Sequence, residues 1–364
     1  KIIDIALGLE GLRRQDGIHA AAVVISPDTI TKYLPVQQKG KEAELVTQFE
    51  MHTVEKLGLL KMDFLGLRNL SIIDRTLELI NDKNIDIDNI SLDDKKTFEL
   101  LSEGKMTGVF QLESRVAQST SRSLKTKTFE DIVALVALIR PGPLGAGMHN
   151  EFTDRATGRK EIEYLHKDLE AILSETYGVI LYQEQVMQIA EKISGFELNE
   201  ADELRKAMGK KIPKVMERQR EKFKNGAVKN GYSEQFAIEL FDQIAYFAGY
   251  GFNKSHSVPY ALLAYQTAYL KANYPAEYIA ACLTAVKRDK DRTAIFLSEA
   301  RDLGVKVSTP DINESLEDFS VSNNEIVFGI SAIRNVGDIT AEKIINEREN
   351  GRFKSIEEFL SRID

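Results

Sequence analysis

The chain has 364 residues, of which 43% are hydrophobic and 29% are charged, and its net charge is −8. This composition is ordinary for a globular protein, and the length predicts two or three domains. The single cysteine excludes an internal disulfide and a thiolate zinc site, and no apolar run approaches the ~20 residues of a membrane span, which argues against a membrane partner.

The first predicted elements are a short helix and a group of strands. Residues 1–17 have helical spacing but no start signal, which indicates a chain cut from a longer one, and no signal peptide is present, so we expect a cytoplasmic location. Residues 19–25 are typical of a buried strand. Residues 44–49 predict another strand that pairs ahead of the strand beginning at Leu59.

The strand that begins at Leu59 reads LLKMDFLGL. Side chains alternate across a strand, so Lys61 and Asp63 share one face and the apolar residues share the other. A strand this apolar is expected to be buried on at least one side, and a buried carboxylate needs a partner or a cation. The structural interpretation is an Asp63–Lys61 ion pair or a carboxylate that caps the turn at Gly66. The functional interpretation is a metal ligand with a lysine beside it for a phosphate.

From residue 67 the pattern becomes helical. Apolar residues from Leu67 to Ile80 recur at the spacing of one helix face, and we place a domain boundary near residue 68 and a softer one near 290–310. Cys282 lies in an apolar helical segment and is expected to be a small core residue. Further helices are predicted at residues 93–104, 129–139, 165–173, 180–193 and 200–208.

Positive charge is concentrated in one segment. Residues 203–229 contain ten Lys/Arg and three Asp/Glu, a local charge of +7, which leaves −15 for the rest of the chain. A polyanion responds to the local field, so this segment is a candidate phosphate-binding surface. A solvated basic face is the commoner explanation of a charge run taken alone.

A glycine-flanked turn and a second turn near the end are candidate ligand contacts. Gly249 and Gly251 allow close approach of the backbone to a ligand, just before His256, although a histidine packed beside a helix start is the simpler interpretation. Near the end, Asn335 and Gly337 make a tight turn into a helix. This turn resembles a helix-hairpin-helix, which presents backbone N–H groups to DNA phosphate; the alternative is an ordinary helical turn.

Eight motifs occur in order and together resemble one family, the alpha subunit of bacterial DNA polymerase III, a C-family replicative polymerase of DnaE type. The family match covers nearly the whole chain. The motifs are GIHAAAVVIS (17–26), KMDFLGLRNLSII (61–73), GVFQLESR (108–115), RPGPL (140–144), YGVILYQEQVMQIA (177–190), LRKAMGKK (204–211), FAGYGFNKSHS (247–257) and YPAEY (274–278).

The resemblance implies an α+β, predominantly helical fold. Residues 1–68 would form the end of the thumb and the C-terminal part of a palm like that of polymerase beta, residues 69–300 the all-α fingers, and residues 301–364 the end of the fingers and the start of a helix-hairpin-helix module. It also implies a DNA-directed DNA polymerase that adds dNTPs to a primer–template with two Mg²⁺ ions. Asp63 would be one of three metal-binding carboxylates, with the other two upstream, so we expect the chain alone to be inactive.

The resemblance also implies roles for individual residues. Asp63 would bind metal and Lys61 would meet phosphates. The triphosphate would be clamped by Arg205, Lys206, Lys210 and Lys211. The incoming nucleotide would contact Lys254 through phosphate and His256 through phosphate or sugar, with Asn253 and Ser255 beside them. The template or nucleotide would be lined by Arg140, Tyr182, Gln183 and Gln185, and DNA by Asn335 and Gly337.

Three alternatives remain open. They are a non-catalytic DNA-binding module, a scaffold for replisome subunits, and a specialised, error-prone alpha subunit. The last is suggested by VAQSTSRSL after Arg115, where the family usually carries Gly-Met and several basic residues. Asp86 and Asp88 alternate as metal-binding aspartates would, but a surface loop explains them better. For the parent protein the family implies a sliding clamp, a proofreading exonuclease subunit and a clamp loader as partners.

Overall fold

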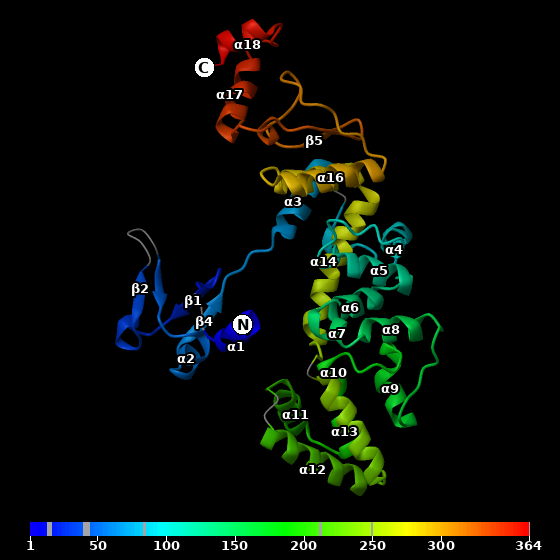
Figure 1. Cartoon of the computed structure of the whole chain (residues 1–364). Helices are drawn as coiled ribbons and strands as arrows, with labels where there is room; N and C mark the ends of the chain where they lie inside the picture. The colour runs from blue at the N-terminus through cyan, green and yellow to red at the C-terminus, as the bar shows by residue number, and fades with distance from the viewer. Residues whose placement is uncertain (13–16, 39–43, 83–84, 211–212, 249, 364) are drawn as a thin grey trace. The chain divides into compact units, whose positions relative to one another are not determined.

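The computed structural model describes residues 1–12, 17–38, 44–82, 85–210, 213–248 and 250–363. The chain divides into two compact units, Lys1–Leu67 and Arg68–Asp364 (Figure 1). Helices predominate, and the described strands form three two-stranded sheets, so the expected α+β, predominantly helical class is confirmed. No helix in the described ranges is long and apolar enough to cross a membrane.

The first unit contains two small antiparallel sheets. Strand β1 pairs with β4, with Ala22 opposite Asp63 and Ile25 opposite Leu60. The strand predicted at residues 44–49 is present as β3, and its partner is β2. The elements of this unit are α1 (Ile2–Leu9), β1 (Ala22–Ile25), the 3₁₀ turn η1 (Ile30–Lys32), β2 (Val36–Gln38), β3 (Leu45–Thr47), α2 (Met51–Lys56) and β4 (Leu60–Asp63).

Strand β4 is buried on one face, as expected, but the exposed face is the apolar one. Leu60 is 56% exposed and Met62 is 40% exposed, and their partners on β1, Ile25 and Val23, are exposed as well. These four side chains share one face of a two-stranded sheet, and a sheet of two strands has no layer of its own to cover that face. The opposite face packs on a small core formed by Leu34, Val54 and Leu59, with Val24, Ile30 and Val36 around it.

The second unit is built from helices that follow the predicted order. The segment predicted at 165–173 is a 3₁₀ turn, Lys167–Leu169, followed by one helical turn. The first helices of the second unit are α3 (Arg68–Ile80), α4 (Lys95–Ser102), α5 (Arg115–Leu124), α6 (Phe129–Leu138), α7 (Pro141–Gly145), α8 (Met148–Ala156) and α9 (Glu170–Leu173). They are followed by α10 (Gln183–Ser194), α11 (Leu198–Lys210), α12 (Pro213–Lys229), α13 (Glu234–Ala248), α14 (Lys254–Asn273), α15 (Pro275–Ala285) and α16 (Lys290–Asp302).

Long helix α14 organises the second unit. Figure 1 shows it running beside α6, and Tyr265 of α14 is wholly buried in the core that α6 also forms. A second core lies among α10, α11, α12 and α13, and a third surrounds α15, where Cys282 is fully buried, as expected of a core residue. The site described below lies where the first two cores adjoin: Leu181 belongs to the first core and Ile180 to the second, and Phe247 packs against both.

A buried ion pair joins α14 to α16. Lys271 has no exposed side-chain surface, and its ammonium donates to Glu299 Oε1 at 2.6 Å and to the carbonyls of Lys105 and Thr107 at 2.7 and 2.8 Å. Burial lowers the pKa of Lys271, and Glu299 acts in the opposite direction. Every donor of the ammonium is used, as a buried charge requires.

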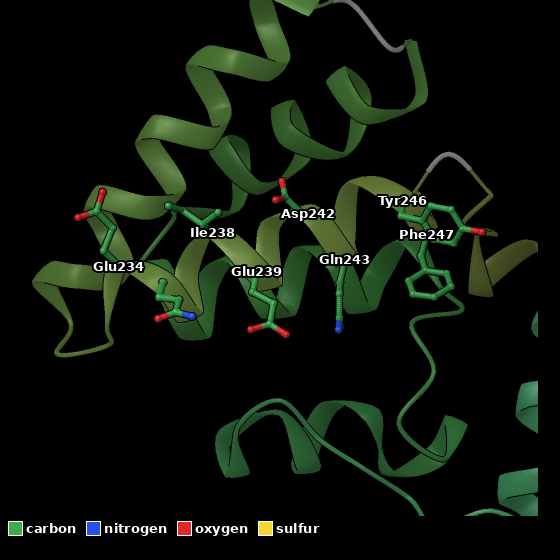
Figure 2. A pocket seen from close by; sticks show the side chains of 8 residues that line it. Glu234, Ile238, Glu239, Asp242, Gln243, Tyr246 and Phe247 are labelled. Carbon is green, nitrogen blue, oxygen red and sulfur yellow. The ribbon is translucent and has the colours of Figure 1, made fainter.

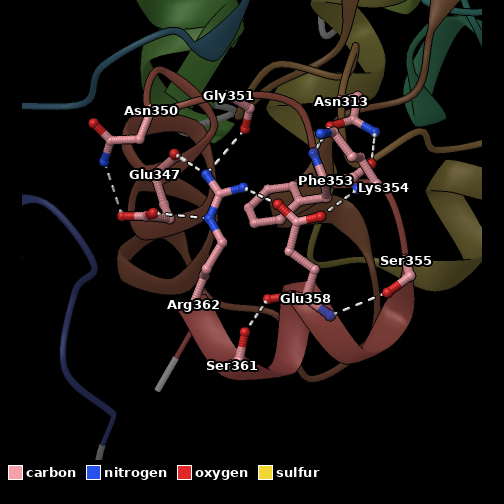
Figure 3. Close-up of polar contacts among 10 residues, drawn as sticks. All are labelled: Asn313, Glu347, Asn350, Gly351, Phe353, Lys354, Ser355, Glu358, Ser361 and Arg362. Carbon is pink, nitrogen blue, oxygen red and sulfur yellow. Dashed lines mark hydrogen bonds and ion pairs between the residues drawn. The ribbon is translucent and has the colours of Figure 1, made fainter.

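The last part of the second unit is a small, mainly helical segment with its own core, formed by Ile330, Ala341, Ile344 and Phe353. Strands β5 (Ser320–Ser322) and β6 (Glu325–Val327) precede the 3₁₀ turn η5 (Ile330–Ala332), α17 (Asp338–Arg348) and α18 (Ile356–Arg362). Arg362 joins the last two helices: its guanidinium donates to Glu347 and Glu358 and to the Gly351 carbonyl, and it lies 4.3 Å from the centre of the Phe353 ring (Figure 3).

Candidate functional site

In the first unit, Lys61 and Asp63 form an ion pair on one face of β4. The Lys61 ammonium lies 2.6 Å from Asp63 Oδ1 and 2.9 Å from Oδ2. The Lys61 side chain is only 16% exposed, whereas half of Asp63 is exposed. The hydrogen bond from Lys61 holds the pKa of Asp63 below its ordinary value, with a smaller contribution from His19. The structure therefore contains the Lys61–Asp63 ion pair, and the ionised carboxylate of Asp63 lies at the surface.

The described residues contain no group of three His, Cys, Asp or Glu side chains placed to hold a metal ion. Asp86 accepts hydrogen bonds from the Asp88 amide and from the Asn89 side chain, which closes a 3₁₀ turn. These contacts agree with the surface-loop interpretation of Asp86 and Asp88.

In the second unit, the cations of α11 share one carboxylate. Arg205 donates to Asp202 Oδ1 from Nε and Nη2, at 2.9 and 2.7 Å, and Lys206 lies 2.6 Å from Asp202 Oδ2. Both pairs lower the pKa of Asp202, with Lys206 the larger cause. Lys210 ends α11, but its side chain, like the whole of Lys211, lies outside the described residues.

Helix α12 is less positive than its sequence indicates. Arg220 pairs with Asp242 at 2.8 Å, Lys222 pairs with Glu200, and Lys224 pairs with Glu221 and Glu234. Three of these carboxylates lie outside residues 203–229, on the neighbouring helices α11 and α13. Counting charge along the sequence therefore overstated the field of this segment.

An open groove follows the outer face of α13. Figure 2 shows that Glu234, Glu239 and Asp242 point from this face, with Ile238 and Tyr246 between and beyond them. A row of carboxylates repels a polyanion. In this groove, however, Glu234 pairs with Lys224 and Asp242 pairs with Arg220, so two of the three carboxylates are compensated by cations of the basic helix α12.

The start of α14 carries the second group of predicted contacts. Asn253 Oδ1 accepts the His256 amide at 2.9 Å, and Glu184 accepts the Lys254 amide at 2.9 and 3.0 Å, so two side chains cap this helix. The Lys254 ammonium lies 2.6 Å from Glu175 Oε2 and 5.4 Å from the centre of the Tyr182 ring. Asn253, Ser255 and His256 are exposed, as a ligand contact requires.

Gln183 joins the α11 cations to the turn before α14. Its Oε1 accepts from Arg205 Nη1 at 3.1 Å, and its Nε2 donates to the Gly251 carbonyl at 3.2 Å. Its own amide donates to the Phe252 carbonyl at 2.9 Å. The structure thus brings Arg205, Gln183 and the turn at 250–253 together, although 68 residues separate Gln183 from Gly251.

Arg140 supports this turn from the other side. It donates to the Tyr250 carbonyl at 2.8 Å and to the Ala137 carbonyl at 2.9 Å, and its guanidinium lies 4.1 Å from the centre of the Phe252 ring. Burial lowers the pKa of Arg140. Gly142, two residues after Arg140 in the RPGPL motif, leaves room for the Tyr250 side chain. A Cβ at Gly142 would lie 2.4 Å from that ring.

Tyr182 and Gln185 require a correction. They are 3% and 1% exposed, and the Gln185 amide is used inside the protein, where it accepts from the Leu181 and Tyr182 amides and donates to Thr176. Neither side chain has surface for a ligand. Both lie beneath the site, Tyr182 as the N-cap residue of α10 and Gln185 in its first turn, and burial raises the pKa of the Tyr182 hydroxyl far above its ordinary value.

The turn near the chain end has the expected backbone. Asn335 is exposed with φ of 67°, a left-handed conformation that asparagine tolerates better than most residues. Gly337 is exposed and immediately precedes α17. The element before this turn is a single 3₁₀ turn rather than a full helix, and Asp338 at the start of α17 pairs with Lys287 and Arg288.

Three carboxylates of the site were missed by the sequence interpretation: Glu175, Glu184 and Asp202. Asp202 had a signal, because it precedes Arg205 and Lys206 by three and four residues, the spacing at which helical side chains meet. Glu184 lies within the ILYQEQ motif, between two residues that were singled out. Glu175 had no signal, because 79 residues separate it from Lys254.

Three models of known protein families match this chain. Residues 1–66 match the model of the bacterial DNA polymerase III alpha NTPase domain, residues 69–231 that of the bacterial DNA polymerase III alpha subunit finger domain, and residues 304–364 that of a helix-hairpin-helix motif. The chain belongs to the bacterial DNA polymerase III alpha subunit family. Five of the eight motifs lie within the two alpha-subunit models, KMDFLGLRNLSII spans their junction, and FAGYGFNKSHS and YPAEY lie between the matched ranges.

Curated relatives agree along the whole chain. DNA polymerase III subunit alpha of Thermus aquaticus is 47% identical over 370 residues, covering all of this chain and 30% of the relative. The proteins of the same name from Escherichia coli K12 and Mycobacterium tuberculosis H37Rv are 47% and 43% identical, and 32% and 31% of their lengths are covered. The chain spans about a third of the length of these relatives.

Proposed function

We propose that the protein to which this chain belongs is a DNA-directed DNA polymerase that extends a primer on a template with dNTPs. The observation that carries the proposal is the convergence of Arg205, Gln183 and the start of α14, which places two sets of cations around one turn. Cations grouped in this way suit the phosphates of a nucleotide, with Arg205 able to bind bidentately and Lys206 and Lys254 as point charges. Family membership supports the same activity.

Asp63 is our candidate metal ligand and Lys61 the candidate phosphate contact beside it. The carboxylate is half exposed and its pKa is low, so it is ionised and accessible at neutral pH, which suits an oxygen ligand of Mg²⁺. Two Mg²⁺ ions would activate the primer hydroxyl and stabilise the charge of the triphosphate. One carboxylate does not hold two ions, so further carboxylates are required, and we expect these 364 residues alone not to extend a primer.

The division of labour follows the family. We assign residues 1–68 to the end of the thumb and the polymerase-beta-like palm, 69–300 to the fingers and 301–364 to the end of the fingers and the start of the helix-hairpin-helix module. Asn335 and Gly337 would present backbone N–H groups to DNA phosphate. Lys210, Lys211, Ser255, Asn253 and His256 remain proposed nucleotide contacts.

For the whole protein we infer the partners and location of a bacterial replicase. These are primer–template DNA, a sliding clamp, a proofreading exonuclease subunit and a clamp loader, in the cytoplasm. A specialised alpha subunit is the second candidate, because α5 carries only Arg115 and Arg122 as cations where the family usually has several more.

Primer extension by the whole polymerase with Asp63→Asn tests the proposal. We expect activity to fall by more than about 100-fold, since even residues that support a metal ligand cost about 10- to 100-fold when changed. DNA affinity is expected to stay unchanged. Retained activity would show that Asp63 is only the partner of Lys61, and the DNA-binding-module alternative would then be favoured.

A dNTP-dependent increase in primer–template affinity separates the two classes. A polymerase binds primer–template more tightly with Mg²⁺ and the complementary dNTP, whereas a passive DNA-binding module does not respond to the nucleotide. Both would show a steep dependence on salt, so salt alone does not discriminate.

A further inference from the structure

The cation at the start of α14 has two separate attachments. Its main chain is fixed by Glu184, which accepts the Lys254 amide, and by the Asn253 cap. Its ammonium is held by Glu175, at 2.6 Å. Removing the Glu175 carboxylate therefore leaves the helix start in place and releases only the charged end of the side chain.

The Lys254–Glu175 pair is accessible and weak. The two side chains are 38% and 42% exposed, and exposed ion pairs contribute little to stability because water and salt screen them. The Lys271–Glu299 pair of the same unit is 0% and 12% exposed and is tied to two carbonyls as well. Of these two lysines, Lys254 is the one whose partner a dissolved anion can replace.

Glu175 also differs from the other carboxylate of the site. Asp202 is shared by Arg205 and Lys206, and Arg205 is held additionally by Gln183, so exchange at Asp202 would disturb a network. Glu175 lies in a short 3₁₀ turn, Ser174–Thr176, and its contact with Lys254 joins that turn to α14. A change at Glu175 therefore acts on one cation.

We propose that Glu175 is an internal counter-anion for Lys254, displaced by the triphosphate of the incoming nucleotide. The inference rests on the proposed function, because it takes Lys254 as a phosphate contact. In the empty site Glu175 neutralises Lys254; on binding, the multiply charged triphosphate replaces the single carboxylate. When pyrophosphate leaves, Glu175 takes the ammonium back. Glu175 is thus a positioning residue that lowers nucleotide affinity and assists product release.

The test is steady-state primer extension by the whole polymerase with Glu175→Gln. We expect KM for dNTP to fall about two- to fivefold, the range given by an exposed ion pair, without a matching rise in kcat. The inhibition constant of inorganic pyrophosphate should fall by a similar factor. Glu175→Asp, which keeps the carboxylate, should behave more like the wild type than Glu175→Gln does.

A matched control removes an exposed pair elsewhere. Lys306 and Glu325 lie 2.9 Å apart on the surface of the same unit, and Glu325→Gln should change neither constant. In a Lys254→Ala background, Glu175→Gln should have no further effect, because its influence passes through Lys254.

The outcomes separate the two proposals. If Lys254→Ala leaves KM for dNTP unchanged, Lys254 is not a phosphate contact and that part of the proposed function fails. If Lys254→Ala raises KM while Glu175→Gln leaves it unchanged or raises it, the phosphate contact stands and the counter-anion role is overturned.

Discussion

The Lys61–Asp63 pair and the cations around α14 are built in opposite ways. In the first unit, lysine and aspartate lie two residues apart on one strand, over a core whose buried members are Leu34, Val54 and Leu59. In the second, Arg205 and Lys254 are held by partners from distant segments, over two large helical cores. A local pair needs only a strand, whereas a site assembled from distant segments depends on its support.

The largest expected effect is a loss of stability when the support of the second unit is weakened. Lys271→Ala leaves Glu299 buried without its cation, and removing one partner of a buried ion pair costs about 3–5 kcal/mol. Urea unfolding followed by circular dichroism should show the loss. Lys306→Ala, at an exposed pair, is the control and should change the midpoint little; equal effects of the two substitutions would mean that the buried tie does not support the unit.

The second prediction concerns the contact between α7 and the turn. Gly142→Ala places a Cβ 2.4 Å from the Tyr250 ring, and overpacking of this kind costs about 1–3 kcal/mol. Because Tyr250 precedes the capped start of α14, we also expect a higher KM for dNTP in primer extension.

Gly145→Ala in the same helix is the matched control. An added Cβ there meets nothing within 4 Å, so stability and KM should stay near the wild-type values. A Gly142→Ala protein with unchanged KM would separate the packing of Tyr250 from the nucleotide site.

A smaller effect is expected when the bridge between α11 and the turn is removed. Gln183→Ala deletes the hydrogen bonds to Arg205 and to the Gly251 carbonyl, and hydrogen bonds contribute about 0.5–1.5 kcal/mol each. KM for dNTP should rise several-fold. Gln188→Ala, on the exposed side of α10, is the control; the same rise in both variants would point to a general effect on the helix.

The smallest predicted effect is on the pH dependence of stability. The first unit should respond at low pH and the second at high pH. The pKa of Asp63 is lowered by Lys61, so the stability that this pair contributes is present above the ordinary aspartate pKa and is lost as pH falls through the lower folded value. The hydrogen bond to Asp168 raises the pKa of Tyr232 to about 12, so the folded state retains a proton that the unfolded state loses near pH 10.

Stability from the Tyr232 contact should therefore decline between about pH 10 and 12. Thermal unfolding of wild type and Tyr232→Phe across this range measures it: the two melting temperatures should converge as pH rises. A constant difference would show that the Tyr232 hydroxyl does not titrate differently in the two states.

Local features of this chain were determined by the sequence. The helix at 129–138 begins where Thr128 caps it, Asn335 adopts the left-handed turn that its side chain tolerates, and Lys61 meets Asp63 because alternate residues of a strand share a face. Motif order was likewise enough to identify the family. The helix start, the turn and the ion pair each depend on residues within a few positions of one another, whose geometry the backbone sets.

The tertiary structure decided which charges are free and which side chains are buried. It paired Lys254 with Glu175 and Arg220 with Asp242, and it placed Gln185 beneath the site. It also left Leu60 and Met62 exposed on a two-stranded sheet. These outcomes follow from how helices and strands pack, and packing brings together residues whose distance along the chain carries no signal of their contact.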